Sequence, residues 1–172
     1  LFSSAPITGI GKHGVFLNDK YFLVQTSEGV TRYDVGEQPH PADSVRILNC
    51  TAIAVGNTGK VYISAGKKVF EYAGWNAIAN GPEKTFNLQD NVTSLSLDNN
   101  GRYLAAGTYA GSIWLKKLGS SADAKTYALH KSSVNDIRFC KLPDGKLHTF
   151  RDEPLHRFPG ILSGDSENQQ KI

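Results

Sequence analysis

The segment VTSLSLDNNGRYLAAGTYAGSIWLKKLG, residues 92–119, decides the fold class of this chain. Its apolar residues recur at steps of two and three positions, with β-branched and small residues between them, which is typical of short β-strands. The turn sequence Asn99-Asn100-Gly101 separates the first two strands, because Asn and Gly adopt the positive φ of a tight hairpin turn at low cost. The segment therefore predicts short strands joined by tight turns.

Weaker copies of this hairpin stand upstream and downstream. The stretch CTAIAVGNTGKVYISAGKKVFEYAG (50–74) precedes it, and VNDIRFCKLPDG (134–145) repeats its opening. Thr51 and Thr93 lie 42 positions apart, and other matching residues keep the same spacing. A repeat of about 40 to 45 residues with four short strands is the sequence signature of a β-propeller blade. We therefore predict an all-β chain of four-stranded antiparallel blades.

The repeat divides the chain into four units, of which the last is incomplete: 7–44, 45–86, 87–128 and 129–172. Each blade has two apolar faces and needs neighbours to bury them. Closed propellers have about 4 to 8 blades, and an open arc leaves blade faces unpaired. We therefore expect an incomplete propeller that forms part of a larger one.

Composition and charge exclude several classes of protein. The 172 residues are 40% apolar and 20% charged, as in an ordinary globular protein. No apolar run reaches the ~18 residues that a membrane helix needs. The net charge of +3 is small and its basic residues are dispersed, which disfavours nucleic-acid binding. Cys50 and Cys140 lack the spacing of a zinc site, and we expect them as buried apolar side chains rather than a disulfide.

Three segments carry a resemblance to a known family. LHKSSVNDIRFCKLPDG (129–145) resembles the opening of a WD repeat, with His130 ahead of the strand and Asp144 and Gly145 in the turn that follows. DNNGRYLAAGTYAGSIWLKKL (98–118) resembles its continuation. EGVTRYDV (28–35) resembles its ending. The chain is thus similar to a divergent member of the WD-repeat β-propeller family.

The resemblance implies structural roles at particular positions. Tyr33 and Asp34 stand where the family usually has Trp-Asp, and His130 would donate from its ring to a neighbouring strand. Lys116-Lys117 replaces the Trp-Asp pair in the third unit, so the family's internal hydrogen-bond network is incomplete there. Trp114 lies inside a predicted strand, and we expect it to pack within the blade.

The sequence contains no recognisable catalytic constellation. The five histidines are scattered, without the HExxH spacing of a metal site, and neither a GxSxG nucleophile elbow nor a phosphate-binding loop occurs. We therefore predict no catalytic residue, no metal site and no cofactor.

Three residues are candidate contacts to a partner protein. Trp75 follows YAG in a predicted loop, where an exposed indole would anchor a partner and simple packing is the alternative. Arg151 and Phe158 lie in the insertion HTFRDEPLHRFPG (148–160), which is longer than hairpin loops normally are. Arg and aromatic residues dominate interface energetics, although a solvated loop is the alternative here.

The leading functional hypothesis is a noncatalytic protein–protein interaction scaffold or sensor module within a larger protein, with another protein or another domain of the same chain as its partner. The alternative is a propeller-type enzyme, a hydrolase or a quinone- or metal-dependent enzyme, whose site is completed by further blades. The small, apolar predicted inner strands YLAAG and VYISAG argue against the enzyme. A third interpretation is a spacer between domains. No nucleic-acid or membrane partner is expected, and the cytoplasm is the favoured compartment.

Overall fold

The computed structural model describes residues 13–26, 28–139 and, for the backbone alone, 147–150. These residues form a succession of β-strands with one short 3-10 helix, η1 (Trp75–Asn80). The predicted all-β class is confirmed.

The strands form three four-stranded sheets and one two-stranded sheet, all antiparallel. The first sheet contains β1 (Gly14–Phe16), β2 (Tyr21–Thr26), β3 (Gly29–Asp34) and β4 (His40–Arg46). The second contains β5 (Cys50–Val55), β6 (Val61–Ala65), β7 (Lys68–Tyr72) and β8 (Lys84–Asn87). The third contains β9 (Val92–Leu97), β10 (Tyr103–Thr108), β11 (Ser112–Lys117) and β12 (Lys125–Ala128). The fourth contains β13 (Asp136–Phe139) and β14 (Leu147–Phe150). Strand order in space follows chain order, so each sheet is a meander.

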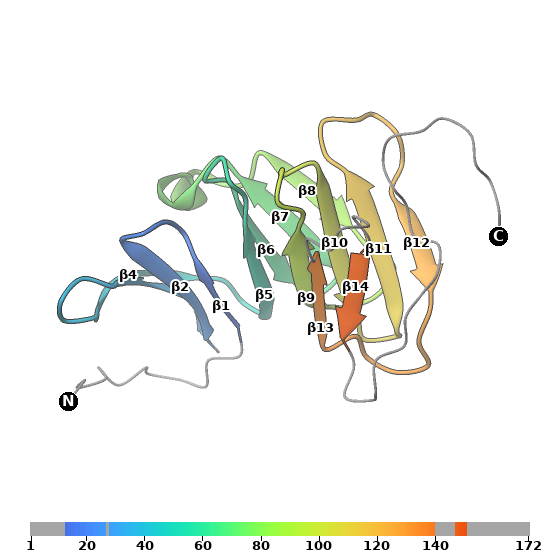
Figure 1. Cartoon of the computed structure of the whole chain (residues 1–172), viewed down its shortest axis with the longest axis horizontal. Helices are drawn as coiled ribbons and strands as arrows, with labels where there is room; N and C mark the ends of the chain where they lie inside the picture. Colours follow the sequence, from blue (N-terminus) through green and yellow to red (C-terminus); the bar gives the residue numbers. More distant parts are fainter. Residues whose placement is uncertain (1–12, 27, 140–146, 151–172) are drawn as a thin grey trace.

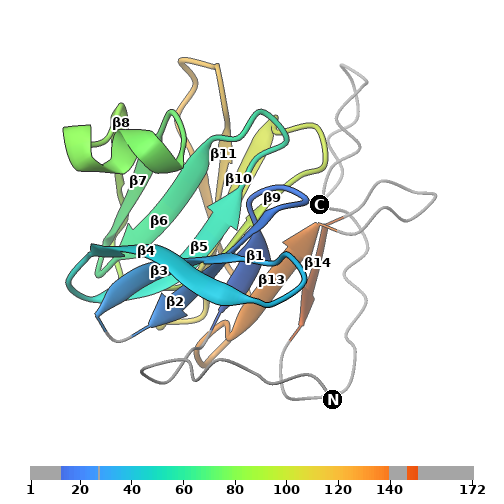
Figure 2. The same cartoon turned by 90° about the vertical axis from the view of Figure 1, so that its left-hand side faces the viewer.

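The sheets stack one after another through their first strands (Figure 1). β5 contacts β1 and β2, β9 contacts β5 and β6, and β13 contacts β9 and β10. Figure 2 shows these first strands near the middle of the molecule, with later strands farther out. The described sheets therefore form an open arc of propeller blades, with the first strand of each blade innermost.

The core lies between neighbouring sheets because successive side chains of a strand point to opposite faces. In β6, Ile63 packs toward the first sheet with Leu23, whereas Tyr62 packs toward the third sheet with Leu104. A smaller cluster, which includes Ala105 and Ile137, joins the third and fourth sheets. The second and third sheets thus bury both of their faces.

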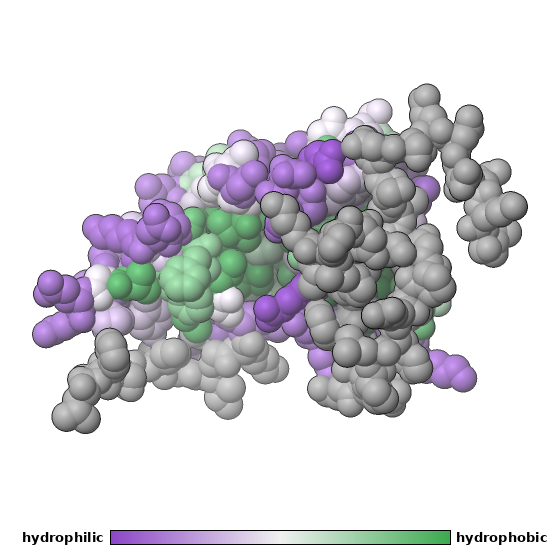
Figure 3. All heavy atoms as spheres, in the orientation of Figure 1, coloured by the Kyte–Doolittle hydropathy of each residue, from purple (hydrophilic) through white to green (hydrophobic). Residues whose placement is uncertain are grey.

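The first sheet differs on the face that points away from the second. Phe22 is only half-buried, whereas Val61 and Leu104, at the same register position of the next two sheets, are fully buried. Phe16 is 62% exposed, with its ring edge-on to that of Phe22 at a centroid distance of 4.8 Å. Figure 3 shows apolar side chains gathered over the inner strands of the first two sheets.

The repeat spacing of the sequence appears directly as contacts between sheets. Asn57 Nδ2 donates to the carbonyl oxygen of Asn99, 42 positions later, at 3.3 Å. Ser94 Oγ donates to the carbonyl oxygen of Val134, 40 positions later, at 3.0 Å. Gly107 permits this close approach, since a Cβ there would lie 2.6 Å from Val134 Cγ1. Equivalent segments of neighbouring sheets therefore lie next to one another.

The residues that resemble family positions lie at corresponding places in the sheets. Tyr33, Tyr72 and Lys116 occupy the same register position near the ends of β3, β7 and β11. Trp114 is buried in β11 beside Phe86, at a ring distance of 5.6 Å. The half-buried His130 follows β12, and the role of its ring stays a prediction. The predicted positions Asp144 and Gly145 lie outside the described residues.

Candidate functional site

A groove of about 610 Å³ lies between the first and second sheets. The turns β1–β2 and β5–β6 and the connection from β7 to β8 all leave the sheets at the same end, because antiparallel strands reverse direction at each turn. Residues from these loops line the groove together with side chains from β2 and β3. The lining includes Leu17, Asn18, Tyr21, Arg32, Trp75 and Asn76.

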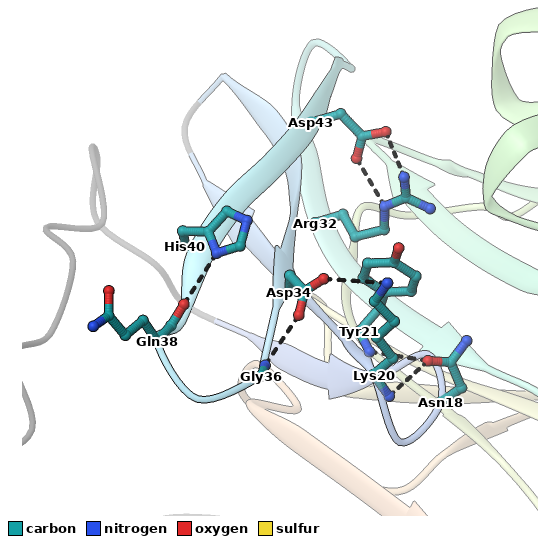
Figure 4. A network of polar contacts seen from close by, with 9 residues as sticks. All are labelled: Asn18, Lys20, Tyr21, Arg32, Asp34, Gly36, Gln38, His40 and Asp43. Carbon is teal, nitrogen blue, oxygen red and sulfur yellow. Dashed lines mark hydrogen bonds and ion pairs between the residues drawn. The ribbon is translucent and has the colours of Figure 1, made fainter.

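Arg32 is the central side chain of the groove. It lies on β3 directly opposite Asp43 of β4. Its Nε and Nη2 donate to Asp43 Oδ1 and Oδ2 at 2.9 and 2.8 Å, which is the bidentate geometry typical of guanidinium–carboxylate pairs. The guanidinium carbon lies 4.4 Å from the ring centroid of Tyr21 and 5.5 Å from that of Trp75. Two aromatic rings and one carboxylate therefore hold this cation in place. Figure 4 shows Arg32 with Asp43 and Tyr21.

The residue type at the position of Arg32 differs between the equivalent strands of the three four-stranded sheets. The equivalent residue of the third sheet is Leu115, a buried apolar side chain. The equivalent residue of the second sheet is Glu71, a buried carboxylate whose Oε1 lies 2.6 Å from Lys60 Nζ. Because the position faces the neighbouring sheet, Arg32 extends along that interface toward the groove.

Trp75 is buried, which is the packing alternative that the sequence left open beside an exposed anchor. The residue begins η1, and its side chain is 6% exposed within the cluster that joins the first and second sheets. The short helix turns Trp75 and Ile78 inward, where burial of apolar area stabilises them. The indole Nε1 donates to Asp43 Oδ2 at 3.2 Å, which satisfies its one donor. Trp75 nevertheless lines the groove, and its role in partner binding stays a prediction.

The β1–β2 turn places a fixed amide at the other side of the groove. Asn18 Oδ1 accepts from the backbone N–H groups of Lys20 and Tyr21, both at 2.9 Å (Figure 4). This bonding orients the side chain, so that Nδ2 stays available as a donor. Nearby, Lys20 Nζ lies 3.5 Å from Asp34 Oδ2. The backbone N–H of Gly36 lowers the pKa of the Asp34 carboxyl below its ordinary value, with a smaller contribution from Lys20.

A second group of charges stabilises the neighbouring sheet. Lys60 Nζ contacts Glu71 Oε1 at 2.6 Å and Glu83 Oε2 at 2.9 Å. Hydrogen bonds to these carboxylates raise the pKa of the Lys60 amine. Burial, together with the nearby Glu71, raises the pKa of the Tyr62 phenol to about 12. These partners satisfy one another, so the group is a structural network.

Other chemistry of the described residues is limited. They contain no cluster of three or more His, Cys, Asp or Glu that could hold a metal ion. Among them, no helix has the length and apolar character that crossing a bilayer would need. Burial raises the pKa of the free thiol of Cys50 to about 12. The candidate contacts Arg151 and Phe158 lie outside the described part of the chain, and Trp75 is the predicted partner residue that can be placed at the groove.

Sequence reasoning missed Arg32 and Asp43. Arg32 directly precedes Tyr33-Asp34, the pair that the family resemblance singled out, and it stands at the position that the buried Leu115 occupies in the third sheet. A charged residue in such a position is a usable signal, because charges are rarely buried without a partner. Asp43 gave no comparable signal, since its strand HPADSVR lacks the apolar alternation of the others.

Comparison with known proteins shows the fold. No protein-family model matches the chain, and no curated protein matches it significantly in sequence. Among solved structures, the crystal structure of the WD40 beta propeller domain of Doa1 is similar, with a TM-score of 0.62 and 16% sequence identity. The match covers 84% of this chain and 49% of the other, so this chain spans about half the length of that structure. The chain therefore has the fold of WD40 β-propeller blades, as the sequence resemblance implied.

Proposed function

We propose that this chain is a noncatalytic protein–protein interaction scaffold or sensor module within a larger protein, and that the groove between its first and second sheets is a binding surface. The observation that carries the proposal is the joining of Arg32, Tyr21 and Trp75 in one groove. Arg, Tyr and Trp are the residue types enriched at the energetic centres of protein interfaces.

The scaffold supports this role. Residues on loops and strand ends are held in place by the first and second sheets, which pack against each other, and a stiff scaffold keeps the conformational cost of binding low. WD40 propellers typically bind other proteins, so the fold agrees with the same role.

The noncatalytic part of the proposal rests on the fold, because WD40 propeller domains are generally noncatalytic. Arg151 and Phe158, which lie outside the described residues, remain proposed partner contacts. We also place the protein in the cytoplasm, which agrees with the free thiol of Cys50.

The test is to capture partners with the immobilised chain from cells, purify the strongest candidate and measure its affinity by titration calorimetry. The proposal predicts a saturable complex whose affinity falls when the groove is obstructed by Asn76→Trp, because Asn76 is an exposed lining residue. The proposal of an interaction module is wrong if no purified protein binds the folded chain. A complex that forms unchanged with the obstructed groove would leave the module intact but move its binding surface elsewhere.

A further inference from the structure

We propose that the groove between the first and second sheets recognises an acidic side chain in an extended segment of the partner protein, through the free edge of the Arg32 guanidinium. This inference rests on the proposed function and adds the chemistry of the partner. It is carried by the charge of the lining, the unused donors of Arg32 and the fixed amide of Asn18.

The charge of the lining favours a carboxylate. Arg32 is the one charged side chain among the described residues that line the groove, and none of them is acidic. A guanidinium remains protonated at every physiological pH. The nearby amine of Lys20 is exposed at the same turn but is paired with Asp34, so Arg32 carries the attraction. An acidic segment therefore meets attraction here, whereas a basic segment meets repulsion.

The guanidinium has donors left for a ligand. Asp43 occupies the edge formed by Nε and Nη2. Among the described residues, no acceptor engages Nη1, which carries two N–H groups. A carboxylate can accept from Nη1 and from the second N–H of Nη2, on the edge of the guanidinium that Asp43 leaves free. The side chain is 17% exposed, which leaves access to this end while its stem is covered.

Asp43 partly neutralises Arg32, so its effect on an incoming carboxylate has to be weighed. The indole N–H of Trp75 also donates to Asp43, which satisfies part of that charge, and Asp43 itself is 45% exposed to screening solvent. What Asp43 supplies in return is rigidity. Together with the rings of Tyr21 and Trp75, Asp43 holds the guanidinium in one orientation. Binding of a ligand therefore does not carry the entropic cost of ordering this side chain.

The rest of the groove suits a peptide segment. Asn18 Nδ2 is held as a donor by the two hydrogen bonds to its Oδ1, and it can bind a backbone carbonyl of the partner. Leu17, Trp75 and Ala77 provide an apolar wall for a neighbouring side chain. A volume of about 610 Å³ falls within the range of about 300 to 1,000 Å³ that is typical of ligand sites.

The experiment selects peptides from a phage-displayed library of random dodecapeptides on the full chain. The strongest peptide is then synthesised with its acidic residues intact and with each replaced by the matching amide. Binding is followed by the indole N–H signals in ¹⁵N NMR, because the chain has two tryptophans and only Trp75 lines the groove. We expect enrichment of acidic residues, a shift of the Trp75 signal without one of Trp114, and affinity at least about tenfold lower for the amide peptide.

Two variants locate the binding. Arg32→Gln should weaken the acidic peptide to the level of its amide version, and Asn76→Trp should block both from an exposed position that leaves the core unchanged. The matched control is Arg102→Gln in the β9–β10 turn, a side chain that is 52% exposed, which should leave binding unchanged. If Arg32→Gln does not fold, Asn76→Trp still decides the outcome.

Several results would overturn the inference: no peptide selected, peptides without acidic enrichment, or binding that persists in Asn76→Trp. These results do not decide the proposed function, which fails only if no purified partner protein binds the folded chain. A partner that binds while acidic peptides do not would therefore refute the chemistry and retain the interaction module.

Discussion

Arg32 and Asp43 are directly opposite each other on neighbouring strands and are joined by two hydrogen bonds of 2.9 and 2.8 Å. The register of β3 and β4 shifts immediately after Arg32, between Arg32 and Tyr33. The pair is therefore the last one before the register shift of the β3–β4 ladder. It positions the guanidinium between the rings of Tyr21 and Trp75. Removing either partner should affect the groove more than the fold.

Asp43→Asn tests this separation of roles. Because the pair is partly exposed to solvent, we expect the free energy of unfolding to fall by at most about 1 kcal/mol. The guanidinium loses a charged partner and gains conformational freedom. The free energy of binding of an acidic peptide should therefore change much more than the free energy of unfolding does. Urea denaturation and titration calorimetry measure the two quantities. A large loss of stability with unchanged binding would reverse the assignment.

Trp75→Ala should destabilise the protein strongly. The indole is buried between the first and second sheets, and truncating a large aromatic core residue typically costs about 3 to 5 kcal/mol. Asn76→Ala, at the next and exposed position, is the matched control and should change stability by less than about 0.5 kcal/mol. Equal effects of the two substitutions in urea denaturation would show that η1 does not turn Trp75 inward.

Gly107→Ala should destabilise the contact between the third and fourth sheets. The added Cβ would lie 2.6 Å from Val134 Cγ1, and overpacking of this kind costs about 1 to 3 kcal/mol. Gly56→Ala is the control, since a Cβ there meets its nearest atoms at an ordinary 3.8 Å. Thermal and urea denaturation of both variants give the comparison, and a stable Gly107→Ala protein would contradict the stacking of β10 near Val134.

Tyr62 gives the protein a pH dependence in the alkaline range. Its folded pKa of about 12 lies above the ordinary value of 10, because burial disfavours the phenolate. The unfolded chain therefore loses this proton first as pH rises. The stabilisation is fully present below about pH 10 and is lost as pH rises toward 12.

Tyr62→Phe isolates this effect. Stability measured by urea denaturation at a series of alkaline pH values should fall less steeply for the variant than for the parent protein. Absorbance of tyrosinate during a pH titration provides an independent check, since the variant should lose one late-ionising group. Identical slopes for the two proteins would mean that Tyr62 is not buried between the second and third sheets.

The sequence predicts much of the fold because its information is local and repeated. The turns at Asn57-Thr58-Gly59 and Asn99-Asn100-Gly101 lie at 42-residue spacing, and the structure joins them by a hydrogen bond. The inner strands YLAAG and VYISAG are small and apolar on both faces, which predicts that neighbouring sheets stack on them. These signals do not depend on knowing the tertiary structure.

The site is harder to predict because its parts come from separate elements. Tyr21, Arg32, Asp43 and Trp75 lie on β2, β3, β4 and η1, and only the packing of the first sheet on the second brings them together. The burial of Trp75 depends on a six-residue 3-10 helix, which is too short to leave a periodic pattern. The sequence therefore leaves open whether this loop tryptophan is an exposed anchor or packs in the core, and the structure shows that it packs.

We expect a partner protein to bind in the groove between the first two sheets. Hydrogen–deuterium exchange of the chain, alone and in complex with its purified partner, followed by mass spectrometry, tests this binding site. Binding in the groove should slow exchange in the β1–β2 turn, residues 17–20, and at the start of η1, residues 74–77, with little change in β12. Protection confined to other segments, with these two unchanged, would contradict it.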